Sequence, residues 1–547
     1  MKISKLSKTL IVITLVSWIL IGFVFYQNAN ATSKKPEKEH KMNIFSGLDL
    51  FNKAFFLLKR NYVDTLYVDD MVVSAINGIL EELDPHTNLF DPQDFKEFTT
   101  STEGEFGGLG ISIVKQGDYI TVVSPIEGTP AYKMGILAGD KIVKVDTTNI
   151  VGITTKDAIK LMRGPKGTKV KITIQRPGVK KELVFEIIRD IIKIHSVPYV
   201  FKIKDNIGYI RIRQFSKNTT EEFVKALDKL ESQGIKGMIV DLRFNPGGLL
   251  NQAVNTVNQF IGPKKLVVYT KGRIESANEE YYTQMNVRRK KYPVIVLINE
   301  ASASAAEIFA GTLQDYDKAL IMGKTSFGKG SVQRLFPLPN NYGIKITVAK
   351  YYIPSGRCIH KDLNDKILMS KRKISKTELE KMKKEEEEKE KKLIYHTLNK
   401  HRVVYGGGGI APDIEVEADK LSNFGVELRR KNEIFKFAVD YMIDHENEVT
   451  KDFVPSDTLV NKFLEKVKQD SIEYTQADLD STYSWIKNTI RSEIIGKKFG
   501  PQESYKISIN EDNQLQEAVK VFEKFDSLNK MFKYAQKLSK EKAENKE

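Results

Sequence analysis

A serine cluster and a downstream lysine have the residue types and spacing of a nucleophile and its base. Residues 299–333 read NEASASAAEIFAGTLQDYDKALIMGKTSFGKGSVQ and follow an apolar run at Pro293–Asn299 that is typical of a buried strand. The pattern predicts a strand, a tight turn and a helix that begins near Ser302 to Ser304. A hydroxyl at such a helix N-terminus lies where free backbone N–H groups and the positive end of the helix dipole favour an oxyanion.

The neighbours of Ser304 allow close approach, and Lys329 offers a base. The alanines beside Ser304 add little bulk, although Ser302 as a simple N-cap is an alternative. Lys329 lies 25 positions after Ser304, between two glycines that let the backbone bend and bring the amine inward. A serine is a poor nucleophile until a base takes its proton, and a lysine is such a base only if burial lowers its pKa from about 10.4. A solvated loop lysine is the alternative, in a chain with 86 Lys and Arg residues.

Gln333 and a pair of glycines add polar groups that this chemistry needs. Gln333 follows Lys329 by four residues, and its amide can orient a neutral amine without restoring the charge. The segment 237–248 reads GMIVDLRFNPGG, an apolar strand followed by a polar turn. Its last residues, Gly247 and Gly248, can point N–H groups into a concavity, which an oxyanion-binding loop requires.

These three segments resemble those of a known family, the C-terminal processing peptidases, also called tail-specific proteases. The family has Ser-Ala-Ser-Ala, Phe-Gly-Lys-Gly-x-Val-Gln and Asp-Leu-Arg-x-Asn-x-Gly-Gly segments, and all three are present here in compatible order and spacing. The resemblance implies that Ser304 is the nucleophile, that Lys329 is the general base and that Gln333 orients the lysine. It implies no cofactor.

The resemblance also implies where an oxyanion would bind. The donors would be the N–H groups of Ala305 and of Gly247 or Gly248. One departure is visible, because many relatives have Ser-Glu where Ala306-Glu307 stands here. That position lies one helical turn from the reacting atom, so we expect activity to be kept.

A peptide-binding module is predicted ahead of these segments. Residues 104–190 alternate in strand fashion around one helix at Thr155–Met162. A glycine-rich loop at 108–111 and an Ala-Gly-Asp turn resemble a PDZ domain, in which such a loop holds a peptide's C-terminal carboxylate and the peptide adds a strand beside Ile111–Val114. By this resemblance Arg163 senses the docked substrate, whereas a surface arginine is the alternative. The implied substrate-binding residues are Gly108, Leu109, Gly110, Ile111 and Arg163.

The whole pattern predicts a multidomain α/β protein, because 547 residues exceed what one core accommodates and strands alternate with helices after Gly208. The expected parts are a signal peptide or membrane anchor (1–31), an N-terminal helical domain (42–100), a β-rich PDZ domain with a helix (101–190), an α/β layered protease core (191–362 and 403–418), a charged helical insertion (363–402) and a C-terminal helical extension (419–547). The resemblance covers about residues 45–415, and the remainder of the chain lies outside it.

The N-terminus predicts export. Lysines precede an apolar run at residues 10–26, and Ala29-Asn30-Ala31 offers a small-residue cleavage site. The 17-residue run is also nearly long enough to span a bilayer, so an uncleaved anchor in the inner membrane is the alternative. Either outcome places the body of the protein in the periplasm or cell envelope.

Composition argues against several other chemistries. Cys358 is the only cysteine, so no intrachain disulfide can form, and no Cys/His cluster supports a metal site. The net charge of +15 is spread along the chain without the aromatic and basic interleaving of a nucleic-acid module. We therefore expect no nucleic-acid partner.

The expected function is that of a serine endopeptidase that recognises the C-terminus of protein substrates through its PDZ domain and cleaves them with a Ser/Lys dyad, for C-terminal processing or degradation of envelope proteins. Its partners would be proteins or peptides with free C-termini, and an adaptor protein is a further candidate. One alternative is a non-catalytic PDZ scaffold that binds envelope proteins. Another is a Ser/His/Asp hydrolase, which would need His86 or His360 to lie near Ser304.

Overall fold

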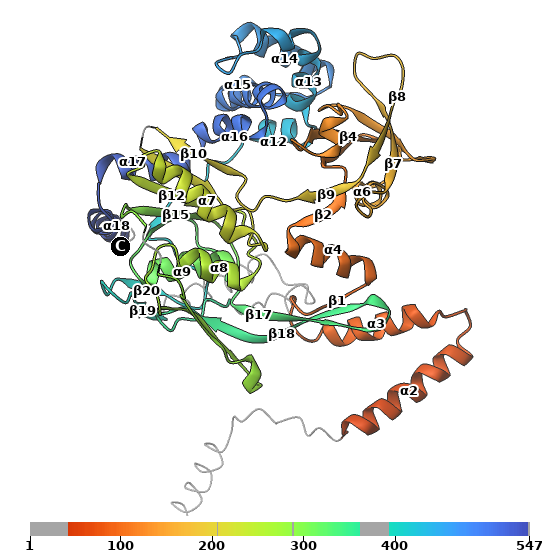
Figure 1. The fold of residues 1–547 in the computed structure, drawn as a ribbon, viewed down its shortest axis with the longest axis vertical. Helices are drawn as coiled ribbons and strands as arrows, with labels where there is room; N and C mark the ends of the chain where they lie inside the picture. Colours follow the sequence, from red (N-terminus) through yellow and green to blue (C-terminus); the bar gives the residue numbers. More distant parts are fainter. Residues whose placement is uncertain (1–41, 205, 287–288, 362–392, 545–547) are drawn as a thin grey trace, which may run out of the picture. The chain divides into compact units, whose positions relative to one another are not determined.

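The computed structural model describes residues 42–204, 206–286, 289–361 and 393–544 (Figure 1). The expected signal or anchor segment 1–31 and the charged residues 363–392 lie outside the described residues. Within those ranges no helix is both long and apolar enough to cross a bilayer. The chain divides into two compact units, of which the first ends at Ile79 and the second begins at Leu80.

The described part of the first unit is helical, as the spacing of its apolar residues predicts. Helix α2 spans Ile44–Asn61 and α3 spans Val68–Leu80. Asn43 caps α2 by accepting a hydrogen bond of 2.9 Å from the N–H of Ser46. None of the side chains of α2 is buried.

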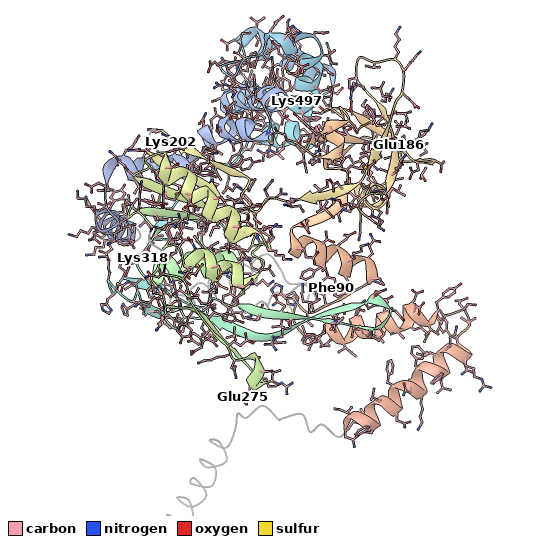
Figure 2. All side chains as sticks on the ribbon, in the orientation of Figure 1. Phe90, Glu186, Lys202, Glu275, Lys318 and Lys497 are labelled. Carbon is pink, nitrogen blue, oxygen red and sulfur yellow. The ribbon has the colours of Figure 1, made fainter. Side chains whose placement is uncertain are left out.

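The second unit opens with a short strand and a helix that lead into the PDZ segment. Strand β1 (Asn88–Phe90) pairs with β18 (Gly343–Tyr352), and α4 (Pro92–Glu103) follows it. Asp91 caps α4 through the N–H groups of Gln93 and Asp94. Phe90, labelled in Figure 2, stacks on Phe98 of α4 with ring centroids 5.1 Å apart.

The PDZ segment is a β-rich module, as predicted. Its main sheet has the order β3-β4-β5-β7-β8, with β6 beside β5, so that among the described strands β3 lies at an edge and pairs only with β4. A separate ribbon pairs β2 with β9. The elements are β2 (Glu105–Gly108), β3 (Ile111–Gln116), β4 (Tyr119–Pro125), α5 (Pro130–Lys133), β5 (Lys141–Val145), β6 (Thr148–Asn149), α6 (Thr155–Met162), β7 (Lys169–Gln175), β8 (Leu183–Ile188) and β9 (Asp190–Lys193).

A six-stranded sheet forms the centre of the α/β core. Its order is β10-β11-β12-β15-β16-β21, in which β10 is antiparallel to β11 and the other neighbours are parallel. Its strands are β10 (Tyr199–Ile203), β11 (Ile207–Arg211), β12 (Gly237–Asp241), β15 (Val294–Ile298), β16 (Leu320–Gly323) and β21 (Ile414–Glu415). The fully buried runs of β12 and β15 are typical of parallel strands that are covered on both faces.

Helices cover both faces of this sheet (Figure 1). On one face Met238 and Val240 pack against α7 (Thr219–Ser232), α8 (Leu250–Val257) and α9 (Ala305–Asp315). On the other face Ile239 packs with α17 (Asn513–Lys524) and α18 (Leu528–Glu544). The last helices of the chain therefore complete a layer of the α/β core.

A second sheet contains the strand that follows Lys329. Its order is β1-β18-β13-β14, and β17 also pairs with β18. The further strands are β13 (Leu266–Gly272), β14 (Glu280–Tyr282) and β17 (Ser331–Pro337), and short 3-10 turns occur at Glu275–Ala277 and Pro339–Asn341. Because β17 follows Lys329 and β18 pairs with β1, this sheet ties residues after the lysine to residues near His86.

One described stretch differs from the expected helical insertion at 363–402. Strand β19 (Ile394–His396) forms a hairpin with β20 (Val403–Tyr405). The turn between them is held by Arg402, which is 7% exposed and forms ion pairs with Asp317 (2.7 Å) and Asp413. Ion pairs between residues far apart in the chain leave no periodic pattern in the sequence. The helical expectation, which rests on the Lys/Glu-rich residues before 393, therefore does not hold for the described strands at Ile394–His396 and Val403–Tyr405.

The remaining C-terminal helices share a core of their own. It is built mainly on α15, whose Ile486, Ile490 and Ile494 recur at helical spacing and are fully buried. Lys497, labelled in Figure 2, lies 3.8 Å from the ring centroid of Phe435. The elements are α12 (Asn423–Arg430), α13 (Glu433–His445), α14 (Asp457–Gln469), α15 (Gln476–Phe499) and α16 (Pro501–Ser508), with 3-10 turns at Glu446–Glu448 and Ile509–Glu511.

Candidate active site

Ser304 stands at the first turn of α9, immediately after the turn that follows β15. Its backbone has φ 54° and ψ −115°, a conformation that costs a non-glycine residue about 1–3 kcal/mol. Ser302 is buried, and its hydroxyl donates to the carbonyl of Leu242 (2.8 Å) and accepts from the N–H of Asn299 (2.9 Å). Ser302 therefore stabilises the turn, while Ser304 takes the strained position at the helix start.

A buried carboxylate joins the serine segment to the lysine segment. Glu307 is 1% exposed, and its Oε2 accepts the N–H groups of Ser304 (2.7 Å) and Lys329 (3.0 Å). Its Oε1 accepts the N–H of Gly328 (2.7 Å) and the hydroxyl of Ser326. Burial raises the pKa of Glu307 to about 7, although the four hydrogen bonds lower it. Above that pH the ionised carboxylate can accept all four donors.

Lys329 is half-buried, and its surroundings favour the neutral amine. Burial and then the nearby charge of Lys345 lower the pKa of Lys329, while Glu307 and Asp84 oppose them. The Tyr351 hydroxyl lies within hydrogen-bonding distance of the carbonyl oxygens of Ser304 (3.1 Å) and Lys329. In the described part of the chain no hydrogen bond joins the Ser304 hydroxyl to the Lys329 amine, so the two residues are joined through their backbones.

Gln333 connects to the loop that follows α3. Its Nε2 donates to the hydroxyls of Ser331 (2.8 Å) and Thr347 (3.4 Å), and the structure gives it no bond to Lys329 in the described ranges. The Thr347 hydroxyl in turn donates to Asp84 Oδ1 at 3.1 Å. Gln333 is thus placed by β18 and by Asp84, two partners that sequence analysis did not identify.

His86 lies on the loop that follows α3, and the charge of Lys329 acts on its imidazole. Its N–H donates to Asp84 Oδ1 at 2.9 Å. Burial and then the charge of Lys329 lower the pKa of its imidazole. Its Nε2 is buried without a hydrogen-bond partner among the described residues. His360 approaches from the other side, because a Cβ on Gly330 would lie 2.6 Å from the His360 nitrogen.

The glycine pair abuts the serine. A Cβ on Gly247 would lie 2.7 Å from Cβ of Ser304, and one on Gly248 would lie 2.1 Å from the Phe215 carbonyl oxygen, so neither position accepts a side chain. The N–H of Gly247 already donates to Asn245 Oδ1 at 2.8 Å. The N–H groups of Gly248 and Ala305 have no hydrogen-bond partner among the described residues. Of the two glycines, Gly248 therefore retains the available donor.

The residues expected to bind a peptide cluster at the open edge of the PDZ sheet. The loop 108–111 leads into β3, whose outer edge has no partner strand in the described chain, and α6 packs beside it. Gly110 has φ 80°, and a Cβ there would lie 2.3 Å from Thr129. Arg163 ends α6 and is half-buried, with its guanidinium 4.5 Å from the ring centroid of Phe106.

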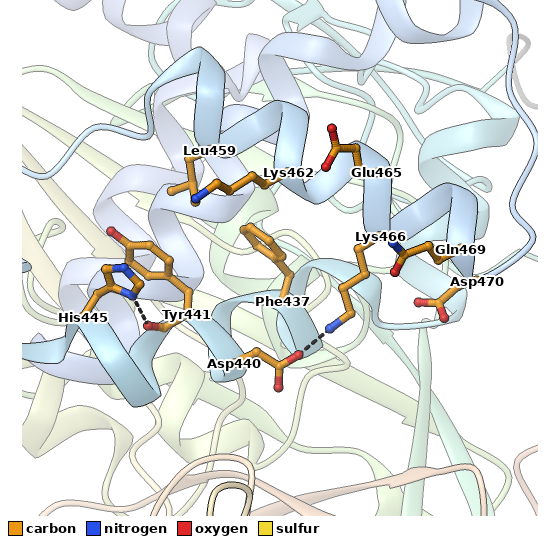
Figure 3. Close-up of a pocket in the computed structure, with 10 residues that line it drawn as sticks. All are labelled: Phe437, Asp440, Tyr441, His445, Leu459, Lys462, Glu465, Lys466, Gln469 and Asp470. Atoms are coloured by element: carbon orange, nitrogen blue, oxygen red, sulfur yellow. Dashed lines mark hydrogen bonds and ion pairs between the residues drawn. The ribbon is translucent and has the colours of Figure 1, made fainter.

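A groove of about 360 Å³ lies elsewhere, between α13 and α14 (Figure 3). Phe437 lines it together with Asp440 and Lys466, which form an ion pair. It shares no residue with the predicted site.

Comparison with known proteins shows which family the chain resembles. The model of peptidase family S41 matches residues 206–368, and a PDZ-domain model matches residues 121–176. The chain is 42% identical over 324 residues to a carboxy-terminal-processing protease of Bartonella bacilliformis, covering 58% of this chain and 74% of the relative. It is 37% identical over 317 residues to the carboxy-terminal processing protease CtpA of Bacillus subtilis, covering 58% and 67%.

Among solved structures, the photosystem II D1 C-terminal processing protease is 28% identical, with a TM-score of 0.34 over 58% of this chain and 90% of that chain. The two family matches define a serine-type peptidase with a PDZ domain. The chain belongs to the carboxy-terminal processing proteases of peptidase family S41. The family resemblance and the serine-peptidase prediction are confirmed, and the serine protease function is favoured over the non-catalytic scaffold.

Proposed function

We propose that this protein is an exported endopeptidase that captures the C-terminus of envelope proteins with its PDZ domain and cleaves them with Ser304 and Lys329. The observation that carries the proposal is the Glu307 carboxylate, which binds the backbones of both residues. A structural serine and a solvated lysine would not need a shared buried anion. Export is supported by the composition of residues 1–31, either as a cleaved signal or as an anchor at residues 10–26.

In the proposed reaction the neutral amine of Lys329 takes the proton of the Ser304 hydroxyl as that oxygen attacks the scissile carbonyl. The N–H groups of Gly248 and Ala305 stabilise the negative oxygen of the tetrahedral intermediate. Lys329 then returns the proton to the leaving amine, which leaves an acyl-enzyme on Ser304. Water hydrolyses this ester, again with Lys329 as the base.

Substrate capture follows from the open edge of β3. An extended peptide can add a strand there through main-chain hydrogen bonds, with its terminal carboxylate at the loop 108–111. Arg163, whose guanidinium lies over the Phe106 ring at the end of α6, would respond to that peptide. An adaptor protein would reach the site by presenting a substrate tail in the same manner.

A serine-directed reagent tests the proposal directly. Treatment with a sulfonyl fluoride or fluorophosphonate is expected to modify Ser304, as detected by peptide mass spectrometry, and to block cleavage of an unfolded substrate. A substrate with a free C-terminal carboxylate should be cleaved faster than its C-terminal amide, because only the carboxylate can use the PDZ loop. Intact substrate with an unmodified Ser304 would favour the scaffold instead.

The pH profile of activity should move in opposite directions in two charge variants. Activity is expected to rise with pH as Lys329 loses its proton. Lys345→Gln removes a positive charge that lowers the pKa of Lys329, so the rising limb should shift to higher pH and activity on that limb should fall several-fold. Asp84→Asn removes a negative charge that raises this pKa, so the limb should shift to lower pH.

The measurement is kcat/KM against pH for each variant. Lys169→Gln, an exposed lysine paired with Glu186 on the PDZ sheet, makes the same charge change far along the chain and should leave the profile in place. Shifts in the same direction for Lys345→Gln and Asp84→Asn would exclude Lys329 as the titrating base.

A further inference from the structure

The C-terminal segment reaches the loop that carries the glycine pair. Arg243, two residues after the end of β12, is 6% exposed. Two of its nitrogens bind both carboxylate oxygens of Asp512, at 2.8 and 2.6 Å, and one of them also binds Gln514 Oε1 at 3.0 Å. Both partners belong to the first residues of α17 and the turn before it, a segment that lies outside the family resemblance.

The adjoining edge of the same guanidinium binds a carboxylate of the core. Asp241 is fully buried, and its carboxylate accepts Arg243 Nε at 3.0 Å and Nη2 at 2.7 Å. The Arg243 and Arg211 charges, acting against burial, lower the pKa of Asp241 to about 2. Arg211 also donates to the carbonyl of Arg243 (3.2 Å) and to the hydroxyl of Tyr505 (2.8 Å). Two arginines therefore balance two aspartates, and one of those aspartates comes from the C-terminal segment.

The residue after this arginine is strained. Phe244 has φ 59°, a left-handed conformation that is unfavourable for a bulky side chain, and it is 67% exposed. Its own packing does not stabilise that conformation. It is held from both sides, by the Arg243 network and by a hydrogen bond of 2.9 Å from its N–H to Asn299 Oδ1. Such strain persists only where the surrounding contacts impose it.

We propose that Asp512 and Gln514 are positioning residues for the oxyanion loop 245–248, acting through Arg243 and the strained backbone of Phe244. Asn245 transmits the position, because its amide donates to the carbonyl of Ile212 (2.8 Å) and accepts the N–H of Gly247. Without Asp512 the guanidinium loses two charge-assisted hydrogen bonds, Phe244 can relax, and the N–H of Gly248 moves away from the oxyanion. The kinetic part of this inference rests on the proposed function.

Asp512→Asn is the informative variant. Asp512 also caps α17 by accepting from the N–H of Leu515 (3.0 Å), and asparagine is an equally good cap, so the substitution removes the charge and spares the helix start. We expect kcat to fall by about 10- to 100-fold, part of the effect of losing an oxyanion donor, with KM within about two-fold. Asp457→Asn makes the same change at an exposed ion pair of α14 and should leave both constants unchanged.

A second substitution separates positioning from simple docking of the C-terminal helices. Asparagine tolerates positive φ, so Phe244→Asn in the Asp512→Asn background should recover about 10-fold in kcat without restoring the lost hydrogen bonds. Wild-type kcat in Asp512→Asn, or no recovery in the double variant, would overturn the proposal. The fraction of protein molecules whose Ser304 reacts with the serine-directed reagent counts the competent sites. If this fraction falls in Asp512→Asn by the same factor as kcat, the proposal would be overturned as well.

Hydrogen exchange distinguishes failure of this inference from failure of the proposed function. Amide exchange across residues 241–248, measured without substrate, should be faster in Asp512→Asn than in wild type and unchanged in Asp457→Asn. Faster exchange supports the anchor even if the wild-type protein cleaves nothing. Unchanged exchange overturns the anchor even if the wild-type protein is fully active.

Discussion

Replacing Lys329 by alanine is expected to lower kcat/KM by about 10⁴-fold or more, as is replacing Ser304, because members of a nucleophile–base pair act as a unit. Lys329 is half-buried, and burial together with Lys345 lowers the pKa of its amine, which favours the neutral form that the proposed base requires. Combining the two substitutions should cost little more than either alone. Initial rates of cleavage of an unfolded substrate measure each constant.

Lys329→Arg sharpens this test. A guanidinium keeps its positive charge at every working pH and cannot act as the base, so this variant should be as inactive as the alanine variant. The melting temperatures of Lys329→Ala and Lys329→Arg should stay near that of wild type, because no hydrogen bond from the Lys329 amine is found among the described residues. Substantial cleavage by Lys329→Arg would assign the base to another group, of which His86 is one candidate.

Glu307→Gln is expected to lower kcat by about 100-fold or more and to destabilise the protein by about 1–3 kcal/mol. The carboxylate accepts four donors on two oxygens, whereas an amide can accept on only one. If the new NH₂ group faces Ser304 and Lys329, it meets two backbone N–H groups. If it faces Ser326 and Gly328, it meets another N–H and a hydroxyl that already accepts from Ile410. The first orientation separates the serine and lysine segments, and the second removes the acceptor of the Gly328 N–H and so displaces the lysine loop next to Lys329.

The control is a second buried glutamate away from the site. Glu433 on α13 is 2% exposed and pairs with Lys436 at 2.9 Å. Glu433→Gln should change the midpoint of urea unfolding without changing kcat of the folded enzyme. Equal kcat values for the Glu307 and Glu433 variants would show that Glu307 contributes only to stability.

The residues of the proposed site could be selected from the sequence. Ser304, Lys329 and the glycine pair were proposed because each lies in a short motif, and the resemblance to a known family gave these motifs their roles: a small-residue turn before a helix, a lysine between glycines, two glycines after a strand. The α/β core was predicted for the same reason, since apolar periodicity is a property of neighbouring positions. The PDZ segment was likewise recognised from its glycine loop and its alternating strands.

Tertiary structure decided which of these groups meet, and through what. In the sequence Glu307 has no feature that distinguishes it from other residues of a helix. In the structure its carboxylate joins the Ser304 segment to the Lys329 segment, about 20 positions further along the chain. The choice of Gly248 over Gly247 depended on a hydrogen bond within the folded loop, and the partners of Gln333 came from β18. Asp512, which binds Arg243, belongs to a segment in which the sequence shows no recognisable motif.

The physical reason is the range of the interactions. Turn, cap and strand preferences act between residues a few positions apart, so they leave a record in the order of amino acids. Burial and hydrogen bonding act between whatever surfaces the fold brings together, and they set the pKa of Lys329 and the anchoring of Arg243. The sequence alone therefore determined the candidate groups and their local geometry, whereas only the packing of distant segments decided their protonation, their partners and their support.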